Sequence, residues 1–167
     1  GPVEALFTVD EETGLTGAFE LGEGMLTGKY LVNLDSEDEG EIFIGCAGGI
    51  DTIATFHYTM EPSPKNYTFF RVDVSDLQGG HSGDDIDKGR VNSNKTVARL
   101  LWDGMQSFEL KLCYFNGGNL RNAIPREAYA IFGVPVRFKE EFVKRYNLFA
   151  ADLEAEFRFR EPNFKIT

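Results

Sequence analysis

The chain has 167 residues, of which 42% are hydrophobic and 13% aromatic. This composition is typical of a folded globular protein and excludes a disordered one. The formal net charge of −10 argues against a nucleic-acid partner, because such proteins need basic surface to neutralise phosphates. No apolar run approaches the ~20 residues that cross a membrane, so we expect no membrane partner either.

The charge is unevenly distributed along the chain. Residues 1–41 carry eleven acidic side chains against Lys29 alone, whereas the other 126 residues balance at 16 acids and 16 bases. Such a shift indicates two parts with different purposes. We therefore expect a boundary near Gly45, with residues 1–45 and 46–167 as the two domains.

The first part begins with an apolar run at residues 3–9, which predicts a buried strand. A weak helix is expected within residues 14–25, and a second buried strand at residues 30–34. Carboxylates follow each strand directly, in Asp10-Glu11-Glu12 and in the cluster that starts at Asp35. Strand, helix and strand with ligand-type residues at the strand ends indicate a piece of a parallel α/β sheet.

These two acidic clusters point to a cation. Neighbouring carboxylates raise one another's pKa unless a positive charge offsets the repulsion. Zinc and manganese ions readily take carboxylate oxygen as a ligand. A solvated acidic loop is the simpler alternative, but the position of both clusters at strand ends favours a metal site.

The second part alternates in hydrophobicity with the period of strands. Residues 50–60 and 67–77 predict an antiparallel hairpin around the prolines of residues 61–64. A helix is expected from residue 91 to Gly104, and strands at 108–115 and 128–134. The core face of this helix is predicted to carry Asn94, Val97, Ala98, Leu101 and Met105. Aromatic and leucine residues spaced by three or four predict a long helix over 138–157. The order ββαββα predicts a four-stranded antiparallel sheet with two helices on one face, an α+β sandwich.

Two loops of the second part carry candidate functional residues. His81 lies in Gly-Gly-His-Ser-Gly, where glycines allow close backbone approach. A lone histidine is more often structural, but this loop context favours contact with a ligand. Arg121 and Asn122 follow a Gly-Gly turn and offer hydrogen-bond donors suited to a carboxylate or a carbonyl.

Three motifs together resemble the di-zinc exopeptidases: Asp-Glu-Glu-x-Gly at 10–14, Gly-His-Ser-Gly at 80–83 and Gly-x-x-x-Asn-x-Ile-Pro at 118–125. The stretches at 35–51 and 116–128 are similar to the aminoacyl-histidine dipeptidases, also called Xaa-His dipeptidases or peptidase D. The resemblance runs from Gly1 to about residue 130. It implies a metal-activated water that hydrolyses Xaa-His dipeptides such as β-alanyl-histidine.

The resemblance also implies roles for individual residues. Glu11 would be the general base, Glu12 a ligand of one zinc ion and Asp35 a ligand of the other, with Mn or Co as possible substitutes. His81 would reach from the lid domain to stabilise the oxyanion. Arg121 and Asn122 match lid positions that approach the dipeptide substrate.

Several residues that the family site requires are missing. The family has a His-x-Asp segment and a bridging Asp upstream and a ligand His downstream, whereas this chain has only His57 and His81. Together with the Gly-Pro start, this predicts a fragment: a catalytic-domain strip (1–45) and part of a lid (46–167). We expect the chain alone to be inactive, not to retain zinc, and to have an unpaired strip that is disordered, re-docked or shared between chains.

Other interpretations stay open at this point. The chain is alternatively a non-catalytic lid or dimerisation module, with a homodimer as its assembly. A third possibility, an acidic binding domain without chemistry, requires the motifs to coincide by chance. The isolated Cys46 and Cys113 form no disulfide framework, so a cytoplasmic location is expected.

Overall fold

The computed structural model describes residues 1–35, 39–46 and 48–167. The chain divides into two units, Gly1–Gly49 and Ile50–Thr167. Across the described residues, no helix has both the length and the apolar character needed to cross a membrane. Each unit is defined by its own internal contacts.

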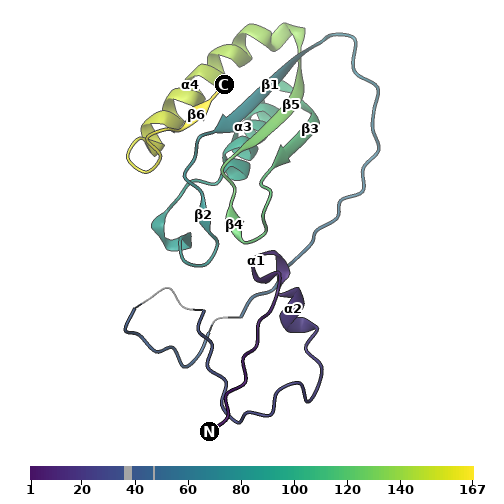
Figure 1. The fold of residues 1–167 in the computed structure, drawn as a ribbon. Helices are drawn as coiled ribbons and strands as arrows, with labels where there is room; N and C mark the ends of the chain where they lie inside the picture. Colours follow the sequence, from purple (N-terminus) through teal and green to yellow (C-terminus); the bar gives the residue numbers. More distant parts are fainter. Residues whose placement is uncertain (36–38, 47) are drawn as a thin grey trace. The chain divides into compact units, whose positions relative to one another are not determined.

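A four-stranded antiparallel sheet forms the centre of the second unit (Figure 1). β5 pairs with β1 along its whole length, from Pro135 opposite Tyr67 to Ala128 opposite Val74. β3 flanks β5, and β6 pairs only with the last residues of β1. A separate two-stranded ribbon joins β2 to β4. The strands are β1 (Tyr67–Ser75), β2 (Gly80–His81), β3 (Lys111–Gly117), β4 (Ala123–Ile124), β5 (Ala128–Pro135) and β6 (Lys165–Ile166).

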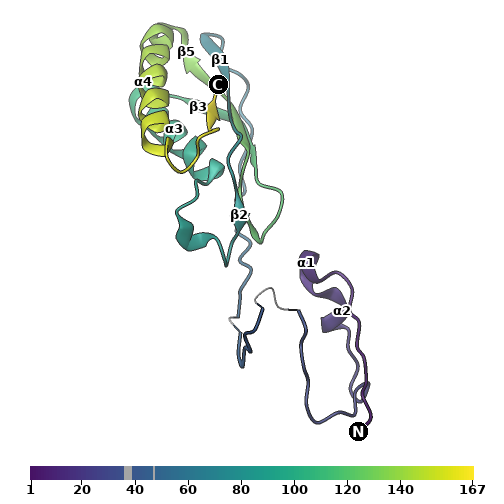
Figure 2. The ribbon, with the colours of Figure 1, turned by 60° about the vertical axis from the view of Figure 1, so that its left-hand side comes forward.

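Two helices, α3 (Ser93–Phe108) and α4 (Lys139–Phe157), lie on one face of this sheet and leave the other face open (Figure 2). Short 3-10 turns, η1 (Ile86–Lys88) and η2 (Val136–Phe138), occur in the loops. Buried side chains of β1 and β5 meet the helices in a continuous core. The Phe142 ring of α4 lies 5.4 Å from Phe132 and 5.1 Å from Phe70, between ring centroids. The predicted sheet with two helices on one face is confirmed.

α4 agrees closely with its prediction, whereas α3 differs in its end and its buried face. The Asn92 side chain caps α3 by accepting a hydrogen bond from the Lys95 backbone N–H at 3.1 Å. Gly104 does not end the helix. A Cβ at this position would lie 2.5 Å from Leu110 Cδ1, so the glycine permits close packing inside the helix. Ala98 and Met105, which were expected on the core face, are exposed.

The predicted hairpin between residues 50–60 and 67–77 is wrong. β1 pairs instead with β5 and β6, and β6 supplies the fourth strand of the sheet. The order within the main sheet is therefore βαββαβ rather than ββαββα. Residues 50–60 are extended but form no strand. Ion pairs hold the ends of this segment, from Asp51 to Arg121 at 2.5 Å and from Glu61 to Lys111 at 2.8 Å.

The third predicted strand, 108–115, forms three residues later as β3. Phe108 still belongs to α3, and Glu109 reverses the chain with a left-handed φ of 53°. The register between β3 and β5 shifts between Leu112 and Tyr114, which is a β-bulge at Cys113. Every β3 residue except Gly117 is exposed, because β3 lies at the edge of the sheet.

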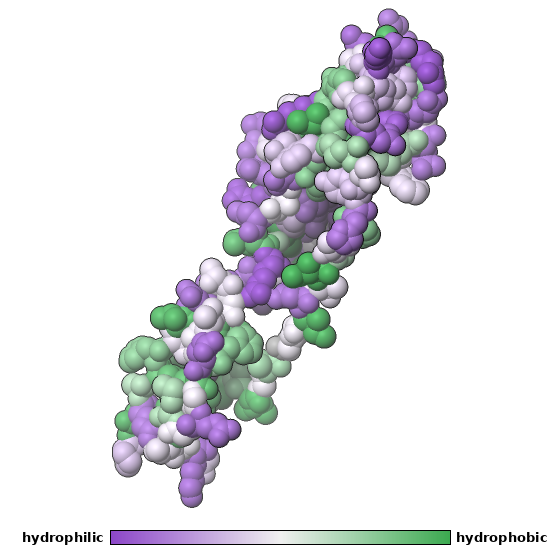
Figure 3. Space-filling view, turned by 90° about the vertical axis from the view of Figure 1, so that its right-hand side faces the viewer, coloured by the Kyte–Doolittle hydropathy of each residue, from purple (hydrophilic) through white to green (hydrophobic). Residues whose placement is uncertain are grey.

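The first unit has no strand among its described residues, so the strands predicted at 3–9 and 30–34 are wrong. It has two four-residue helices, α1 (Glu11–Gly14) and α2 (Thr16–Phe19), where one weak helix was expected. None of its described residues is buried, and Phe7 is 91% exposed. Hydrophobic side chains therefore lie open on the surface of this unit (Figure 3). A buried parallel strand forms only beside neighbouring strands, and this unit offers none.

Candidate functional site

The ribbon of β2 and β4 positions His81. His81 lies opposite Ala123, and Gly80 opposite Ile124. One residue further, the Ser82 N–H donates to the Asn122 carbonyl at 2.8 Å. The structure thus brings together two of the predicted site residues, His81 and Asn122, on paired backbones although they are far apart in the sequence.

The His81 imidazole has a defined arrangement of hydrogen bonds. Its Nδ1 accepts from the Gly83 backbone N–H at 3.1 Å and from the Asp84 N–H at 3.4 Å. A neutral imidazole that accepts at Nδ1 carries its proton on Nε2. Because the side chain is about half exposed, at 51%, this N–H can donate to a carbonyl oxygen or to an oxyanion.

The glycines before His81 are required by close packing. Gly79 adopts a left-handed φ of 69°, and a Cβ there would lie 2.3 Å from Arg126 Cγ. Gly80 adopts a φ of 149°, and a Cβ there would lie 2.5 Å from Asp85 Oδ2. Both positions exclude a side chain, which explains the Gly-Gly-His sequence in structural terms.

Arg121, the third predicted residue of the second unit, lies in the turn between β3 and β4. Its Nη1 contacts Asp51 Oδ2 at 2.5 Å. The guanidinium group is therefore engaged by a carboxylate of the same unit. A substrate carboxylate would have to compete with Asp51 or share the guanidinium with it.

The three acidic residues predicted for the catalytic centre all belong to the first unit: the base Glu11 and the zinc ligands Glu12 and Asp35. Glu11 and Glu12 form the first turn of α1, and both are exposed. The Asp10 carbonyl accepts from the Leu15 N–H at 2.8 Å, with Asp10 itself at a left-handed φ of 58°. The exposed Asp35 donates its backbone N–H to Asn33 Oδ1 at 3.0 Å. Residues 36–38 of the second acidic cluster lie outside the described part.

The described residues do not make a metal centre by themselves. In residues 1–35, 39–46 and 48–167, no three His, Cys, Asp or Glu side chains come together in a group that could hold a metal ion. Two carboxylate ligands and no histidine fall short of the three or four protein ligands that zinc sites contain. The acids of the first unit therefore do not fit a complete zinc site without further ligands.

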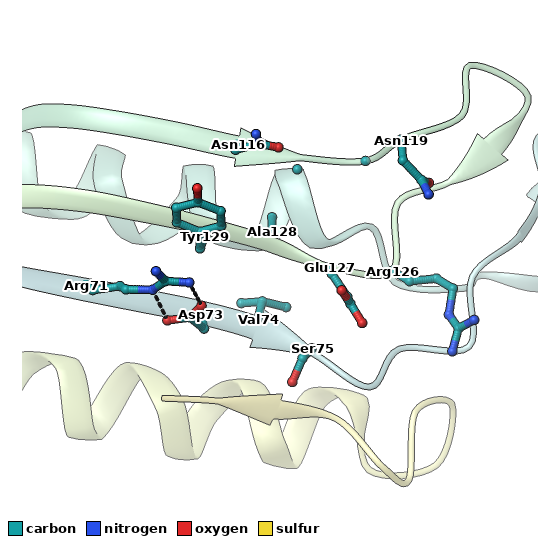
Figure 4. A pocket seen from close by; sticks show the side chains of 12 residues that line it. Arg71, Asp73, Val74, Ser75, Asn116, Asn119, Arg126, Glu127, Ala128 and Tyr129 are labelled. Atoms are coloured by element: carbon teal, nitrogen blue, oxygen red, sulfur yellow. Dashed lines mark hydrogen bonds and ion pairs between the residues drawn. The ribbon is translucent and has the colours of Figure 1, made fainter.

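A separate cavity of about 580 Å³ lies on the open face of the sheet (Figure 4). Arg71 and Asp73 of β1 form a bidentate ion pair there at 2.6 and 2.8 Å. The Arg71 guanidinium also lies over the Tyr129 ring, 4.2 Å from its centroid. The hydrogen bond from Arg71 lowers the pKa of Asp73. Because Asp73 already compensates the positive charge of Arg71, this guanidinium is not available to bind an anion in the cavity.

Comparison with known proteins identifies the second unit. The profile of the peptidase dimerisation domain matches residues 63–162, which is more than half of the chain. The chain belongs to the peptidase dimerisation domain family. The α+β architecture, with a four-stranded sheet and two helices, is the fold of this domain.

Two relatives extend the similarity beyond the peptidase dimerisation domain. The chain is 41% identical over 166 residues to the cytosol non-specific dipeptidase of Escherichia coli (strain K12), covering 99% of this chain and 34% of that protein. A crystal structure of aminoacylhistidine dipeptidase from Vibrio alginolyticus superposes with a TM-score of 0.73 at 36% identity. That match covers 96% of this chain and 33% of the other. The resemblance drawn from the motifs is confirmed, and the chain spans about a third of the length of both relatives.

Three of the six predicted site residues lie inside the range matched by the peptidase dimerisation domain, and three lie before it. His81, Arg121 and Asn122 lie within the matched range, whereas Glu11, Glu12 and Asp35 precede it. The individual roles of all six stay predictions. The motifs did not identify Asp85, whose carboxylate contacts the His81 backbone at 2.8 Å. An acid four residues after a histidine in a Gly-rich loop was the available signal.

Proposed function

We propose that this chain is the part of a metal-dependent dipeptidase that comprises a strip of the catalytic domain and the peptidase dimerisation domain acting as a lid. The His81 loop carries this proposal. It presents a half-exposed imidazole at the end of a ribbon, with Nδ1 accepting a backbone N–H and Nε2 left to act as the donor, in a chain 41% identical to a dipeptidase. An exposed, oriented donor of this kind suits the polarisation of a peptide carbonyl.

In the parent enzyme, Glu11 takes a proton from the attacking water and delivers it to the departing amine. Glu12 and Asp35 would hold zinc, or manganese or cobalt, together with ligands from outside this chain. When bound there, such an ion would lower the pKa of its water towards neutrality. His81 donates its Nε2–H to the developing oxyanion, while Arg121 and Asn122 contact the substrate. We propose Xaa-His dipeptides, such as β-alanyl-histidine, as substrates, and the cytoplasm as the location.

The chain alone is proposed to be inactive, because it holds about half of the site. Its carboxylates do not complete a metal centre, and its first unit buries none of its described residues. Equilibrium dialysis with zinc and an assay with β-alanyl-histidine test this point. Stoichiometric zinc retention together with turnover by this chain would contradict it.

Substitution of Glu11 in the full-length parent tests the catalytic assignment. We expect Glu11→Ala to lower kcat by roughly 100- to 10,000-fold, since it removes the general base, while the melting temperature stays unchanged. Glu23→Ala is the matched control, because it removes another exposed acid of the same unit. Full activity of the Glu11→Ala parent would remove Glu11 from the mechanism.

A second function, homodimerisation, is favoured by the edge of the sheet. Among the described residues β3 pairs only with β5, so its outer edge is free to pair. Exposed apolar side chains gather on β3 and on the adjoining helix α3. We propose that this surface pairs with a second copy of the chain. Its members are Trp102, Met105, Leu112, Tyr114 and Phe115.

Sedimentation equilibrium of paired variants tests the dimer. We expect Trp102→Glu and Leu112→Glu to shift the chain towards monomer, because each places a charge in the apolar interface. Leu148→Glu changes an exposed leucine on α4 and should leave association unchanged. A dimer that survives both interface substitutions would place the interface elsewhere.

A further inference from the structure

We propose that Asp85 is a positioning residue that holds His81 as the Nε2–H tautomer with its donor outward. The catalytic consequence rests on the proposed dipeptidase function, whereas the tautomer itself does not.

Asp85 fixes both backbone groups of His81. Its Oδ2 accepts the His81 N–H at 2.8 Å, and its own N–H donates to the His81 carbonyl at 3.1 Å. The two bonds close the Ser82–Asp84 segment into a tight loop. This closure places the Gly83 and Asp84 N–H groups against the histidine ring.

The closed loop selects one tautomer of the ring. Nδ1 receives the Gly83 and Asp84 N–H groups at 3.1 and 3.4 Å, so a proton on Nδ1 would face two donors. N–H groups that face one another repel, so a proton on Nδ1 would cost at least one of these two backbone hydrogen bonds. The Asp84 carboxylate, at 3.9 Å from Nδ1, is too far for a direct hydrogen bond. The loop therefore accommodates the proton on Nε2.

Two cations hold the Asp85 carboxylate in place. Lys88 Nζ lies 2.7 Å and Arg90 Nη2 lies 3.3 Å from Asp85 Oδ1. Arg90 also donates through Nη1 to the Gly79 carbonyl at 2.8 Å. Oδ1 thus contacts the cations, while Oδ2 accepts the hydrogen bond from the His81 N–H. The hydrogen bond from Lys88, together with the His81 N–H, lowers the pKa of Asp85.

Gly80 completes the arrangement. A Cβ at this position would lie 2.5 Å from Asp85 Oδ2 and 2.7 Å from Asp85 Cβ. A methyl group there would displace the carboxylate from the His81 N–H without removing its charge. Gly80→Ala is therefore a second way to break the same contact, and it also strains the backbone because Gly80 adopts a φ of 149°.

The ¹⁵N chemical shifts of the histidine rings in the labelled 167-residue chain test the tautomer directly. At neutral pH, wild-type His81 should show a protonated Nε2 and an unprotonated, accepting Nδ1. His57 lies exposed on the extended segment and serves as an internal reference that samples both tautomers. We expect Asp85→Asn and Gly80→Ala to move His81 towards the His57 pattern. Lys88→Met, which keeps Arg90 and the carboxylate, should leave most of the wild-type signature.

Two outcomes overturn the tautomer proposal. One is a wild-type His81 that resembles His57, and the other is a wild-type signature that persists in both Asp85→Asn and Gly80→Ala. Circular dichroism of each variant establishes that the sheet and helices are retained. If either variant fails to fold, the other one decides the outcome together with the wild type.

Kinetics of the full-length parent test the catalytic consequence. Asp85→Asn should lower kcat by up to about 100-fold, part of the loss seen when an oxyanion donor is removed, with little change in KM. A wild-type parent without dipeptidase activity would contradict the proposed function and leave the tautomer result standing. An active parent whose Asp85→Asn variant loses the tautomer but keeps kcat would overturn the positioning role alone.

Discussion

Both units of the chain contain apolar runs, but these runs are buried in the second unit and exposed in the first. Residues 3–9 and 30–34 of the first unit are as apolar as β1 and β5 of the second. β1 and β5 pair with each other and bury alternate side chains under α3 and α4. The apolar runs of the first unit form no strand and stay exposed.

This difference shows that hydrophobic periodicity indicates whether a segment is suited to burial. It does not indicate whether the chain contains the partners that bury it. The second unit contains every partner of its own core. The first unit carries the predicted base Glu11 and the predicted zinc ligands Glu12 and Asp35, but its described residues supply neither neighbouring strands nor further ligands. The comparison with relatives about three times as long is consistent with the proposal that other parts of a parent enzyme complete it.

The largest expected loss of stability distinguishes the core of the second unit from the exposed side chains of the first. Phe132 is 1% exposed and contacts Phe142, so Phe132→Ala should lower the free energy of unfolding by about 3–5 kcal/mol. The matched change Phe7→Ala, at a 91% exposed side chain, should alter it by less than about 0.5 kcal/mol. Urea titrations followed by circular dichroism measure both. Equal losses in the two variants would mean that the first unit has a core of its own.

A buried carboxylate provides the next prediction. Glu161 is 2% exposed and accepts from the Gln78 N–H at 2.8 Å and the Val91 N–H at 3.1 Å. It thereby ties the end of β1 and the start of α3 to the segment after α4. Glu161→Ala leaves the buried Val91 N–H unpaired, at a cost of roughly 1–3 kcal/mol, and also removes the part-buried hydrogen bond from the Gln78 N–H.

The control for this substitution lies five residues earlier. Glu156 forms a bidentate ion pair with Arg99 at 2.9 and 3.1 Å on the surface. Glu156→Ala should cost less than about 1 kcal/mol, as exposed ion pairs do. Thermal unfolding of both variants makes the comparison. A Glu161→Ala protein as stable as Glu156→Ala would show that the buried carboxylate does not link these segments.

The smallest effect concerns acid stability. Arg145 donates two hydrogen bonds of 2.8 Å to Asp103 and lowers the pKa of its carboxyl group. A folded-state pKa below the unfolded one stabilises the protein at neutral pH, and that stability is lost as pH falls through the lowered value. The melting temperature of wild type should therefore fall as the pH drops below about 4, the ordinary pKa of an aspartate, and it should fall less steeply in Asp103→Asn. Identical slopes in the two proteins would contradict this contribution.

Much of the second unit could be predicted from its sequence. The aromatic spacing over residues 138–157 predicts α4 because each apolar residue returns to the same helical face. The alternation in β1 identifies its buried face. The segment 50–60 alternates in the same way but forms no strand, since periodicity does not specify a partner. β6, with two residues, is too short to show any period.

The arrangement of the candidate site could not be predicted from the sequence. The glycines around His81 predict contact with a ligand, and this contact stays a prediction. The backbone donors at its Nδ1 and the contact with Asp85 depend on how the loop folds back over four residues. An acid four residues after a histidine is compatible with this closure but does not specify it. The pairing of Asn122 with Ser82 likewise follows from the ribbon of β2 and β4, which joins segments about forty residues apart.

Hydrogen exchange of the 167-residue chain in dilute solution tests the contrast between the two units most directly. We predict strong protection of amides in β1, β5 and α3 and near-unprotected exchange in residues 3–9 and 30–34. Opening free energies near the global value for the second unit and near zero for the first would agree with this account. Strong protection of residues 3–9 would contradict it, because that strip would then fold without the rest of a catalytic domain.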